Sequence, residues 1–251
     1  MMPGPRLWTR PSPPKLSPFL RVTEARMQGG DMLSQWLTWP VLAVWAVISL
    51  ACAAWVIQDL RRHNAFLGGM MKVAWVLTVL YSGPLGLAVY WYTGRGQIAH
   101  DSLWRKSFRS VAHCYSGCGL GEIIGVLTLA GLLAMTGWPV NLTTFTLAYI
   151  IGFAFTLGPL VQAGEAFGVA LKDSVVAESI SITVMEASAL SVNAGLAGDA
   201  RIGDPVFWGA LIISLSVGLL VAYPVNVLLI RFGVKQGMHN PRHMMEHQGH
   251  H

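Results

Sequence analysis

The chain has 251 residues, of which 53% are hydrophobic and only 12% are charged, and its mean hydropathy is +0.51. Soluble domains carry about 25% charged residues, so this composition excludes an ordinary soluble protein and predicts a membrane protein with several spans. The net charge of +5 is carried largely by tails and loops, where basic residues set membrane orientation. We therefore expect a lipid bilayer and no nucleic acid as a partner.

The N-terminal segment, residues 1–32, is predicted to be a disordered tail. It is rich in proline and arginine and has too few apolar residues to form a packed core. Residues 33–95 follow as two predicted transmembrane helices. The first covers residues 36–60, with Trp36 and Trp39 at one interface and Arg61 and Arg62 at the other. The second covers residues 73–92 and is interrupted by Gly83-Pro84.

Residues 105–235 are predicted to form a four-helix transmembrane module, with spans at 111–135, 142–170, 173–193 and 206–230. The third of these contains Asp173, Glu178 and Glu186, so we expect neighbouring helices to shield it from lipid. The fold class is therefore all-α, a polytopic transmembrane helix bundle of about six spans with disordered N- and C-terminal tails.

Six spans place both termini on the same side, and the basic residues indicate which side. With the N-terminus inside, nine Lys and Arg fall on the inner side and four on the outer side, although Arg61 and Arg62 oppose this orientation. We expect a multi-pass protein of the bacterial inner (plasma) membrane with both termini in the cytoplasm. The inner residues are Arg21, Arg26, Arg95, Arg105, Lys106, Arg109, Lys172, Arg231 and Lys235, and the outer residues are Arg61, Arg62, Lys72 and Arg201.

Two cysteines and a carboxylate are the most informative residues of the module. Cys114, Cys118 and Glu122 recur every four residues and therefore lie along one helical face. Ionisable groups are costly inside a membrane, so such a row indicates a functional site. Cys52, in the first span, is interpreted as a small buried apolar residue.

The thiol pair favours a soft-metal site. Thiolates bind Cu(I) and Zn(II), and the four-residue spacing lets both face one ion, with His113 or Glu122 completing the set. His113 projects about 100° from Cys114 and would serve more easily from a non-helical turn. A reversible disulfide would be strained within a regular helix, and a purely structural role for two buried cysteines stays open.

Gly117, Gly121 and Gly125 form a small-residue ridge on the same helix, about 60° from the thiols. Such a ridge allows a neighbouring helix to approach closely. A partner packed on the glycines would flank the thiol pair.

Polar groups of the other spans are expected at a similar depth. Because the spans alternate in direction, Glu165, Glu178, Glu186 and Asn226 should share a layer with the thiols on the inner side of the bundle. We interpret them as a pathway or a polar belt, with helix–helix hydrogen bonding as the alternative.

Residues 236–251 form a tail rich in Met and His. Imidazole and thioether groups bind copper and related ions, so a second metal-binding region is possible here, and a disordered tail that binds metal adventitiously is the alternative. Its candidate ligands are Met238, His239, His243, Met244, Met245 and His247.

The chain resembles one bacterial family. The motifs are the His-Cys…Gly-Cys opening of residues 113–118, the 171–183 stretch, and Tyr223-Pro224-Val225-Asn226 with Gly233-Val234-Lys235. They are similar to the membrane family called domain of unknown function 4396, whose members look like four-span modules. The resemblance covers about residues 105–240. It implies an acidic residue four positions after the second Cys, which Glu122 provides. The 184–187 stretch diverges from the family pattern, so the resemblance supports Glu186 less well as a site residue. Family members are often labelled copper-oxidase related, but no multicopper-oxidase histidine motif occurs in this chain.

Together these features predict a membrane protein that binds or moves a soft metal ion, copper being favoured, as a permease or membrane chaperone. The alternatives are a non-transporting accessory subunit in a homo-oligomer or membrane complex, and a thiol redox protein. No hydrolase triad, phosphate loop or haem-attachment motif indicates broader enzymatic activity.

Overall fold

The computed structural model describes residues 35–98, 100–162, 164, 166–198, 200–238 and 240–242. Within these ranges every regular element is helical, which confirms the prediction of an all-α bundle. The predicted N-terminal tail and most of the Met/His-rich tail lie outside the described residues. The helices are α2 (Trp39–Arg62), α3 (Gly69–Ser82), α4 (Pro84–Thr93), α5 (Leu103–Val126) continued by a short π-helix η1 (Leu127–Leu132), α6 (Trp138–Gln162), α7 (Phe167–Ala197) and α8 (Pro205–Arg231).

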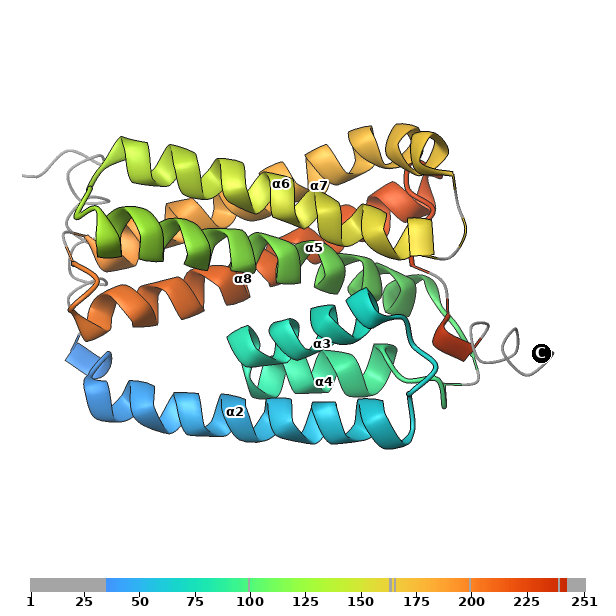
Figure 1. The fold of residues 1–251 in the computed structure, drawn as a ribbon, viewed down its shortest axis with the longest axis horizontal. Helices are drawn as coiled ribbons and strands as arrows, with labels where there is room; N and C mark the ends of the chain where they lie inside the picture. The colour runs from blue at the N-terminus through green and yellow to red at the C-terminus, as the bar shows by residue number, and fades with distance from the viewer. Residues whose placement is uncertain are drawn as a thin grey trace, which may run out of the picture.

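Among the described residues, five helices are long and apolar enough to cross a membrane: α2, α5 with η1, α6, α7 from Val175 onward, and α8. They lie side by side with their long axes roughly aligned (Figure 1). At about 1.5 Å per residue, the 24 residues of α2 extend about 36 Å, which exceeds the ~30 Å hydrocarbon core of a bilayer. The fold is therefore that of a multi-pass α-helical membrane protein.

The predicted second span is a hairpin of two short helices. The 14 residues of α3 extend only about 21 Å, and the chain reverses at Gly83, whose φ of 53° is readily adopted by glycine. A Cβ on Gly86 would lie 2.8 Å from the Val79 Cα, and the rings of Trp75 and Tyr90 are 5.3 Å apart, so α4 runs back along α3. Figure 1 shows the hairpin entering and leaving the bundle at the same end. The predicted second span is therefore a pair of short antiparallel helices in this structure.

The base of the hairpin is held by the carboxylate of Asp59, near the end of α2. Asp59 accepts hydrogen bonds from the Tyr90 hydroxyl at 2.7 Å, the Asn64 amide at 2.9 Å and the Arg95 guanidinium at 3.1 Å. The side chain of Asp59 is almost fully buried. Because a buried charge without partners is costly, this network fixes the end of α4 beside the end of α2.

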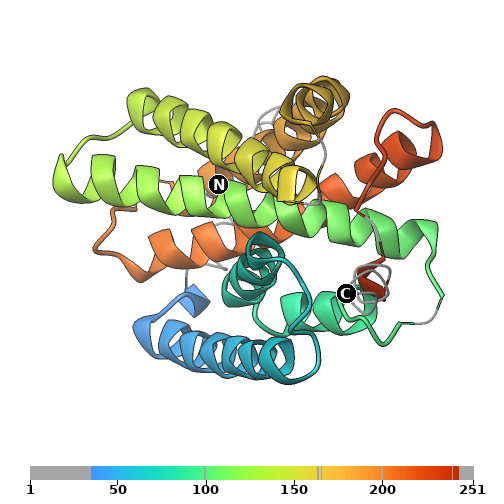
Figure 2. The same ribbon diagram turned by 45° about the vertical axis from the view of Figure 1, so that its right-hand side comes forward.

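The tip of the hairpin reaches the middle of α5. The hydroxyls of Ser82 and Tyr115 are 2.6 Å apart, and the ring of Tyr81 covers Gly119, where a Cβ would lie 2.7 Å from it. Tyr115 lies next to Cys114 in sequence. The hairpin therefore packs against α5 at the level of the thiols, with α6 on another side of α5 (Figure 2).

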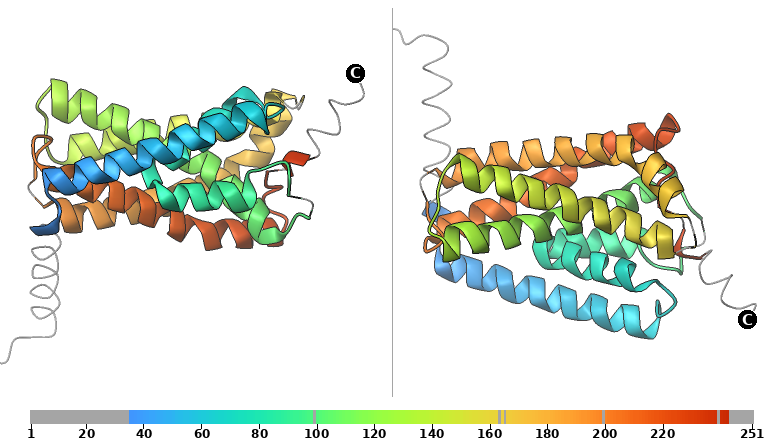
Figure 3. Two further views of the ribbon diagram at one scale, coloured as in Figure 1. Left: turned by 90° about the horizontal axis from the view of Figure 1, so that it is seen from below. Right: turned by 45° about the horizontal axis from the view of Figure 1, so that its top comes forward.

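The hairpin changes the topology predicted from six spans. Helix α2 begins at one end of the bundle and α8 ends at the other (Figures 1 and 3). The chain therefore enters its first span and leaves its last span on opposite sides. The physical reason is that α3 and α4 turn back at Gly83 and add no crossing. Both termini were expected on one side because six crossings return a chain to the side where it started. Without the sixth crossing, this expectation no longer follows.

Basic residues gather at the end of the bundle where α2 ends and α5 begins, hereafter the basic end. Of the twelve Lys and Arg among the described residues, eleven lie there and only Arg201 lies at the opposite end. Arg61 and Arg62 no longer oppose the orientation indicated by the other basic residues, because the hairpin returns the chain to the same side. The eleven are Arg61, Arg62, Lys72, Arg95, Arg105, Lys106, Arg109, Lys172, Arg231, Lys235 and Arg242.

Helices α5 and α6 approach through glycine. A Cβ on Gly117 would lie 2.6 Å from the Gly152 Cα, a Cβ on Gly121 would overlap the backbone of Ala148, and one on Gly125 would meet Thr144. The glycine ridge predicted on α5 thus lies directly on the α6 backbone. Close backbone contact of this kind is one of the interactions by which helices associate in lipid.

Cysteine labelling tests the hairpin. In a chain with Cys52, Cys114 and Cys118 replaced by Ser, single cysteines at Ala65, Gln97 and Val234 should react with an impermeant maleimide from the same side of sealed vesicles. Cysteines at Thr136 and Gly203 should react only from the other side. All five positions are exposed. Labelling of Ala65→Cys and Gln97→Cys from opposite sides would restore the six-span topology.

Gly121→Ala should destabilise the bundle by about 1–3 kcal/mol, because the added methyl group forces α6 away from α5. Gly168→Ala is the matched control: nothing lies within 4 Å of its added Cβ, and alanine favours the helix by up to ~1 kcal/mol. The measurement is the thermal unfolding midpoint of both variants in detergent. An unchanged midpoint for Gly121→Ala would contradict the tight α5–α6 contact.

Candidate functional site

The two thiols of α5 lie in the centre of the bundle. Cys114 and Cys118 are buried, and their Sγ atoms are 4.0 Å apart. The surrounding core includes Ile182 and Met185 of α7 and Leu219 of α8. Both cysteines are free thiols, and they share one helical face as the four-residue spacing predicts.

Gly152 of α6 provides the space for the thiol pair. A Cβ at this position would lie 2.6 Å from the Sγ of Cys118 and 3.5 Å from the Cys114 carbonyl oxygen. The α6 backbone therefore forms one wall of the site. Gly152 was not among the residues predicted from the sequence; its only sequence signal is a glycine within an apolar span, where small residues let helices approach closely.

Two carboxyl groups face each other beside the thiols. Glu122 of α5 and Glu186 of α7 lie close enough to interact electrostatically, and Glu186 also lies close to the Cys118 thiol. Both carboxyl groups are at least 95% buried. The Oε2 atom of Glu186 has no hydrogen-bond donor. Because two facing carboxylates repel strongly in a low dielectric, this pair requires a shared proton or a cation.

The distance between the thiols suits a shared metal ion. Two Zn–S bonds of about 2.3 Å at a tetrahedral angle put the sulfurs about 3.8 Å apart, close to the 4.0 Å observed. Within the described part of the chain, no three His, Cys, Asp or Glu side chains already converge as a finished metal site. The thiols thus supply two ligand positions, and a third requires rotation of a carboxyl group such as that of Glu186.

His113 contacts other helices from its position at the start of this site. Its Nε2 lies 2.7 Å from the sulfur of Met71 on α3, and its ring is close to the backbone of Phe155 on α6. Pro159 lacks the N–H that would pair with the Phe155 carbonyl in a regular helix. The Nδ1 atom of the buried His113 ring has no hydrogen-bond partner. A role for His113 as a metal ligand stays a prediction.

A second polar cluster lies nearer the basic end. Lys235 forms a buried ion pair with Glu178 at 2.5 Å and donates a hydrogen bond to Asn226 at 2.8 Å. The Asn226 amide donates in turn to Ser181 of α7 at 2.6 Å. Glu178 and Asn226 were predicted belt residues and here share one network. Sequence reasoning placed Lys235 in a loop and missed it, because nothing local indicates that the chain folds back after α8.

The other predicted residues are less informative. Glu165 lies outside the described residues, as do the candidate tail ligands His239, His243, Met244, Met245 and His247. Met238 is described and buried, and its backbone N–H donates to Ser110 at 3.0 Å.

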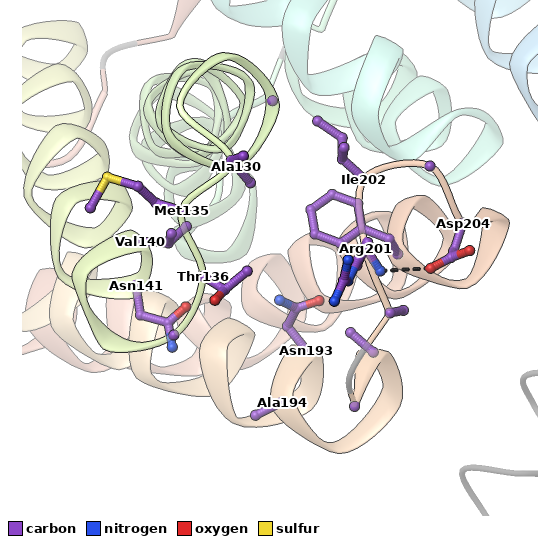
Figure 4. Close-up of a pocket in the computed structure, with 18 of the residues that line it drawn as sticks. Ala130, Met135, Thr136, Val140, Asn141, Asn193, Ala194, Arg201, Ile202 and Asp204 are labelled. Carbon is purple, nitrogen blue, oxygen red and sulfur yellow. Dashed lines mark hydrogen bonds between the residues drawn. The ribbon is translucent and has the colours of Figure 1, made fainter.

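A cavity of about 1330 Å³ opens at the end of the bundle opposite the basic end. It lies among the end of η1, the start of α6, the end of α7 and the start of α8, and Figure 4 shows Asn141, Asn193 and Arg201 among its lining residues. Asn193 follows Glu186 by seven residues, so the two lie on nearly the same face of α7, about 10 Å apart along its axis. The cavity, hereafter the vestibule, therefore lies on the side of the carboxyl pair that faces away from the basic end.

The class of protein follows from these observations: a multi-pass α-helical membrane protein with thiols and carboxyl groups buried together in its centre. Residues 103–235 match the model of the family described as Domain of unknown function (DUF4396), and the chain belongs to this family. The match begins at the first residue of α5 and ends at Lys235, so α2 and the hairpin lie outside it. The family description assigns no activity, metal or substrate. No curated protein and no solved structure matches the chain.

Glu122→Gln should leave stability nearly unchanged, because the amide can donate a hydrogen bond to Glu186 without a shared proton or cation. Glu122→Leu should cost about 1–3 kcal/mol, because it leaves the buried Glu186 carboxyl group without a partner. The unfolding midpoint in detergent measures both effects. Equal midpoints for the Gln and Leu variants would show that the two carboxyl groups do not interact.

Proposed function

We propose that the protein binds a thiophilic metal ion between Cys114 and Cys118 and moves it between the vestibule and the basic end. The 4.0 Å separation of two buried thiols carries this proposal, because it nearly equals the separation of two thiolates on one ion. The unpartnered Glu186 oxygen beside Cys118 supports it. A buried acceptor of this kind can be satisfied by a proton, a water molecule or an ion.

Copper(I) is the favoured ion and zinc(II) is the alternative. Soft thiolate ligands select both ions. Two thiolates satisfy Cu(I), whereas tetrahedral Zn(II) would also recruit oxygen from Glu186 or Glu122. The Met- and His-rich residues after 236 add soft ligands to the same chain and favour copper. His113 is the further candidate ligand.

The orientation proposed is the one in which the basic end faces the cytoplasm of a bacterial inner membrane. Eleven of the twelve described Lys and Arg lie at that end, and cytoplasmic loops carry the excess of such residues. The vestibule then opens to the outside, and α2 begins on the outer side. Maleimide labelling of Thr136→Cys in intact spheroplasts should therefore succeed, whereas labelling of Val234→Cys should require permeabilisation.

A structural subunit is the second candidate function. The observation in its favour is that Glu178, Asn226 and Lys235 satisfy one another within the chain and join α7, α8 and the segment after α8. Such a network can serve to hold helices together without moving an ion.

Metal analysis separates these functions. Purified wild-type protein, loaded with Cu(I) or Zn(II) under reducing conditions and then dialysed, should retain stoichiometric metal, and Cys114→Ser/Cys118→Ser should retain none. Cys52→Ser is the matched control, because this part-exposed thiol lies on α2 and should not affect retention. X-ray absorption at the metal edge should show sulfur ligands.

Each contrary result identifies another function. Loss of metal on truncation after residue 236, but not in the double Cys variant, would place the site in the tail. Absence of metal together with reversible oxidation of Cys114 and Cys118 to a disulfide would indicate a redox protein. Stable protein with neither property would favour the structural subunit.

A further inference from the structure

The chain folds back into the bundle after α8. The backbone N–H groups of Val234 and Lys235 donate to the Leu229 carbonyl at 2.9 and 3.1 Å, which turns the segment at the end of the helix. Further along, Met238 is fixed to α5 by its hydrogen bond from the backbone N–H to Ser110 and by Arg109, which donates to its carbonyl. These contacts aim the side chain of Lys235 inward, where it is almost completely buried.

The ammonium group of Lys235 contacts oxygen atoms from two helices. Glu178 Oε1 of α7 lies 2.5 Å from Nζ, and Asn226 Oδ1 of α8 lies 2.8 Å from it. The other oxygen of Glu178 lies 3.4 Å from the Thr156 hydroxyl of α6. All three oxygen-bearing side chains are at least 97% buried.

The orientation of Asn226 is fixed independently of the lysine. Its Nδ2 donates to the Ser181 hydroxyl at 2.6 Å and to the Ala222 carbonyl at 2.9 Å, so its Oδ1 must point toward the position occupied by Nζ. The helices alone therefore direct a carboxylate oxygen and an amide oxygen at one point. Lys235 reaches that point from a segment outside the helices.

We propose that these oxygens form a site for a small monovalent cation such as Na⁺ or K⁺, and that the Lys235 ammonium occupies it as a tethered cation. Carboxylate and amide oxygens are the ligands that hard cations prefer. The single carboxylate matches a single positive charge. The distances of 2.5 and 2.8 Å from Nζ show that both oxygens converge on one point.

This site is separate from the thiol pair. Glu178 precedes Glu186 by eight residues on α7, which places it about 12 Å nearer the basic end. Its oxygens are hard donors, whereas the thiols are soft. The inference therefore stands without the proposed metal site, and it assigns Lys235 a role as an intramolecular competitor of free cations.

The test replaces Lys235 in the Cys114→Ser/Cys118→Ser protein, so that no result depends on the thiols. Lys235→Met should lower the unfolding midpoint, because Glu178 loses its counter-ion. NaCl or KCl should restore the midpoint in a saturable manner, whereas choline chloride, whose cation is too large for the site, should not. Lys172→Met, an exposed change of the same charge at the same end, is the matched control and should show no such cation dependence.

A second variant separates a cation site from simple charge neutralisation. In Lys235→Met/Glu178→Gln the need for a counter-ion is removed, so the midpoint should no longer respond to Na⁺ or K⁺. The proposal is overturned if Lys235→Met responds equally to choline, if no cation restores it while the double variant is stable, or if it fails to fold at any cation concentration. Equilibrium dialysis of radioactive Na⁺ should show stoichiometric binding to Lys235→Met and a loss of binding in the double variant.

Discussion

The structure depends on the close contact between α5 and α6. Lipid provides little hydrophobic driving force for helix association, so the two helices are held by backbone packing at Gly117, Gly121 and Gly152. The same contact creates the thiol site, because Gly152 leaves the space that the Sγ of Cys118 fills. The lack of side chains at these glycines therefore permits both the close helix contact and the burial of the Cys118 thiol.

The re-entrant hairpin places a turn of polar backbone beside the middle of α5. The turn at Gly83 is tolerated there because the tip is buried against α5, where Ser82 meets Tyr115. Its base is fixed at the basic end by Asp59. The family match begins only at α5, so the hairpin and α2 lie outside the matched residues and pack against the helices within them.

Three polar layers follow one another along α7. Asn193 lines the vestibule, Glu186 faces Glu122 beside the thiols, and Glu178 holds Lys235 near the basic end. The first layer lines a cavity, whereas the last is closed by an ammonium group of the chain itself. Carboxylates inside a membrane are costly, and each of the last two layers gives its carboxylate a partner: Glu122 for Glu186 and Lys235 for Glu178.

The sequence by itself determined the helical class, the four-helix module, the common face of Cys114, Cys118 and Glu122, and the glycine ridge of α5, because helical periodicity and hydropathy are local properties. Only the tertiary structure decided that residues 69–93 turn back, since a hydropathy window cannot distinguish one interrupted span from two short antiparallel helices. It also brought Glu186 to Glu122, Gly152 to Cys118 and Lys235 to Glu178. These pairs join residues from different helices or from the segment beyond α8, and their meeting depends on how the helices pack, which no local pattern records.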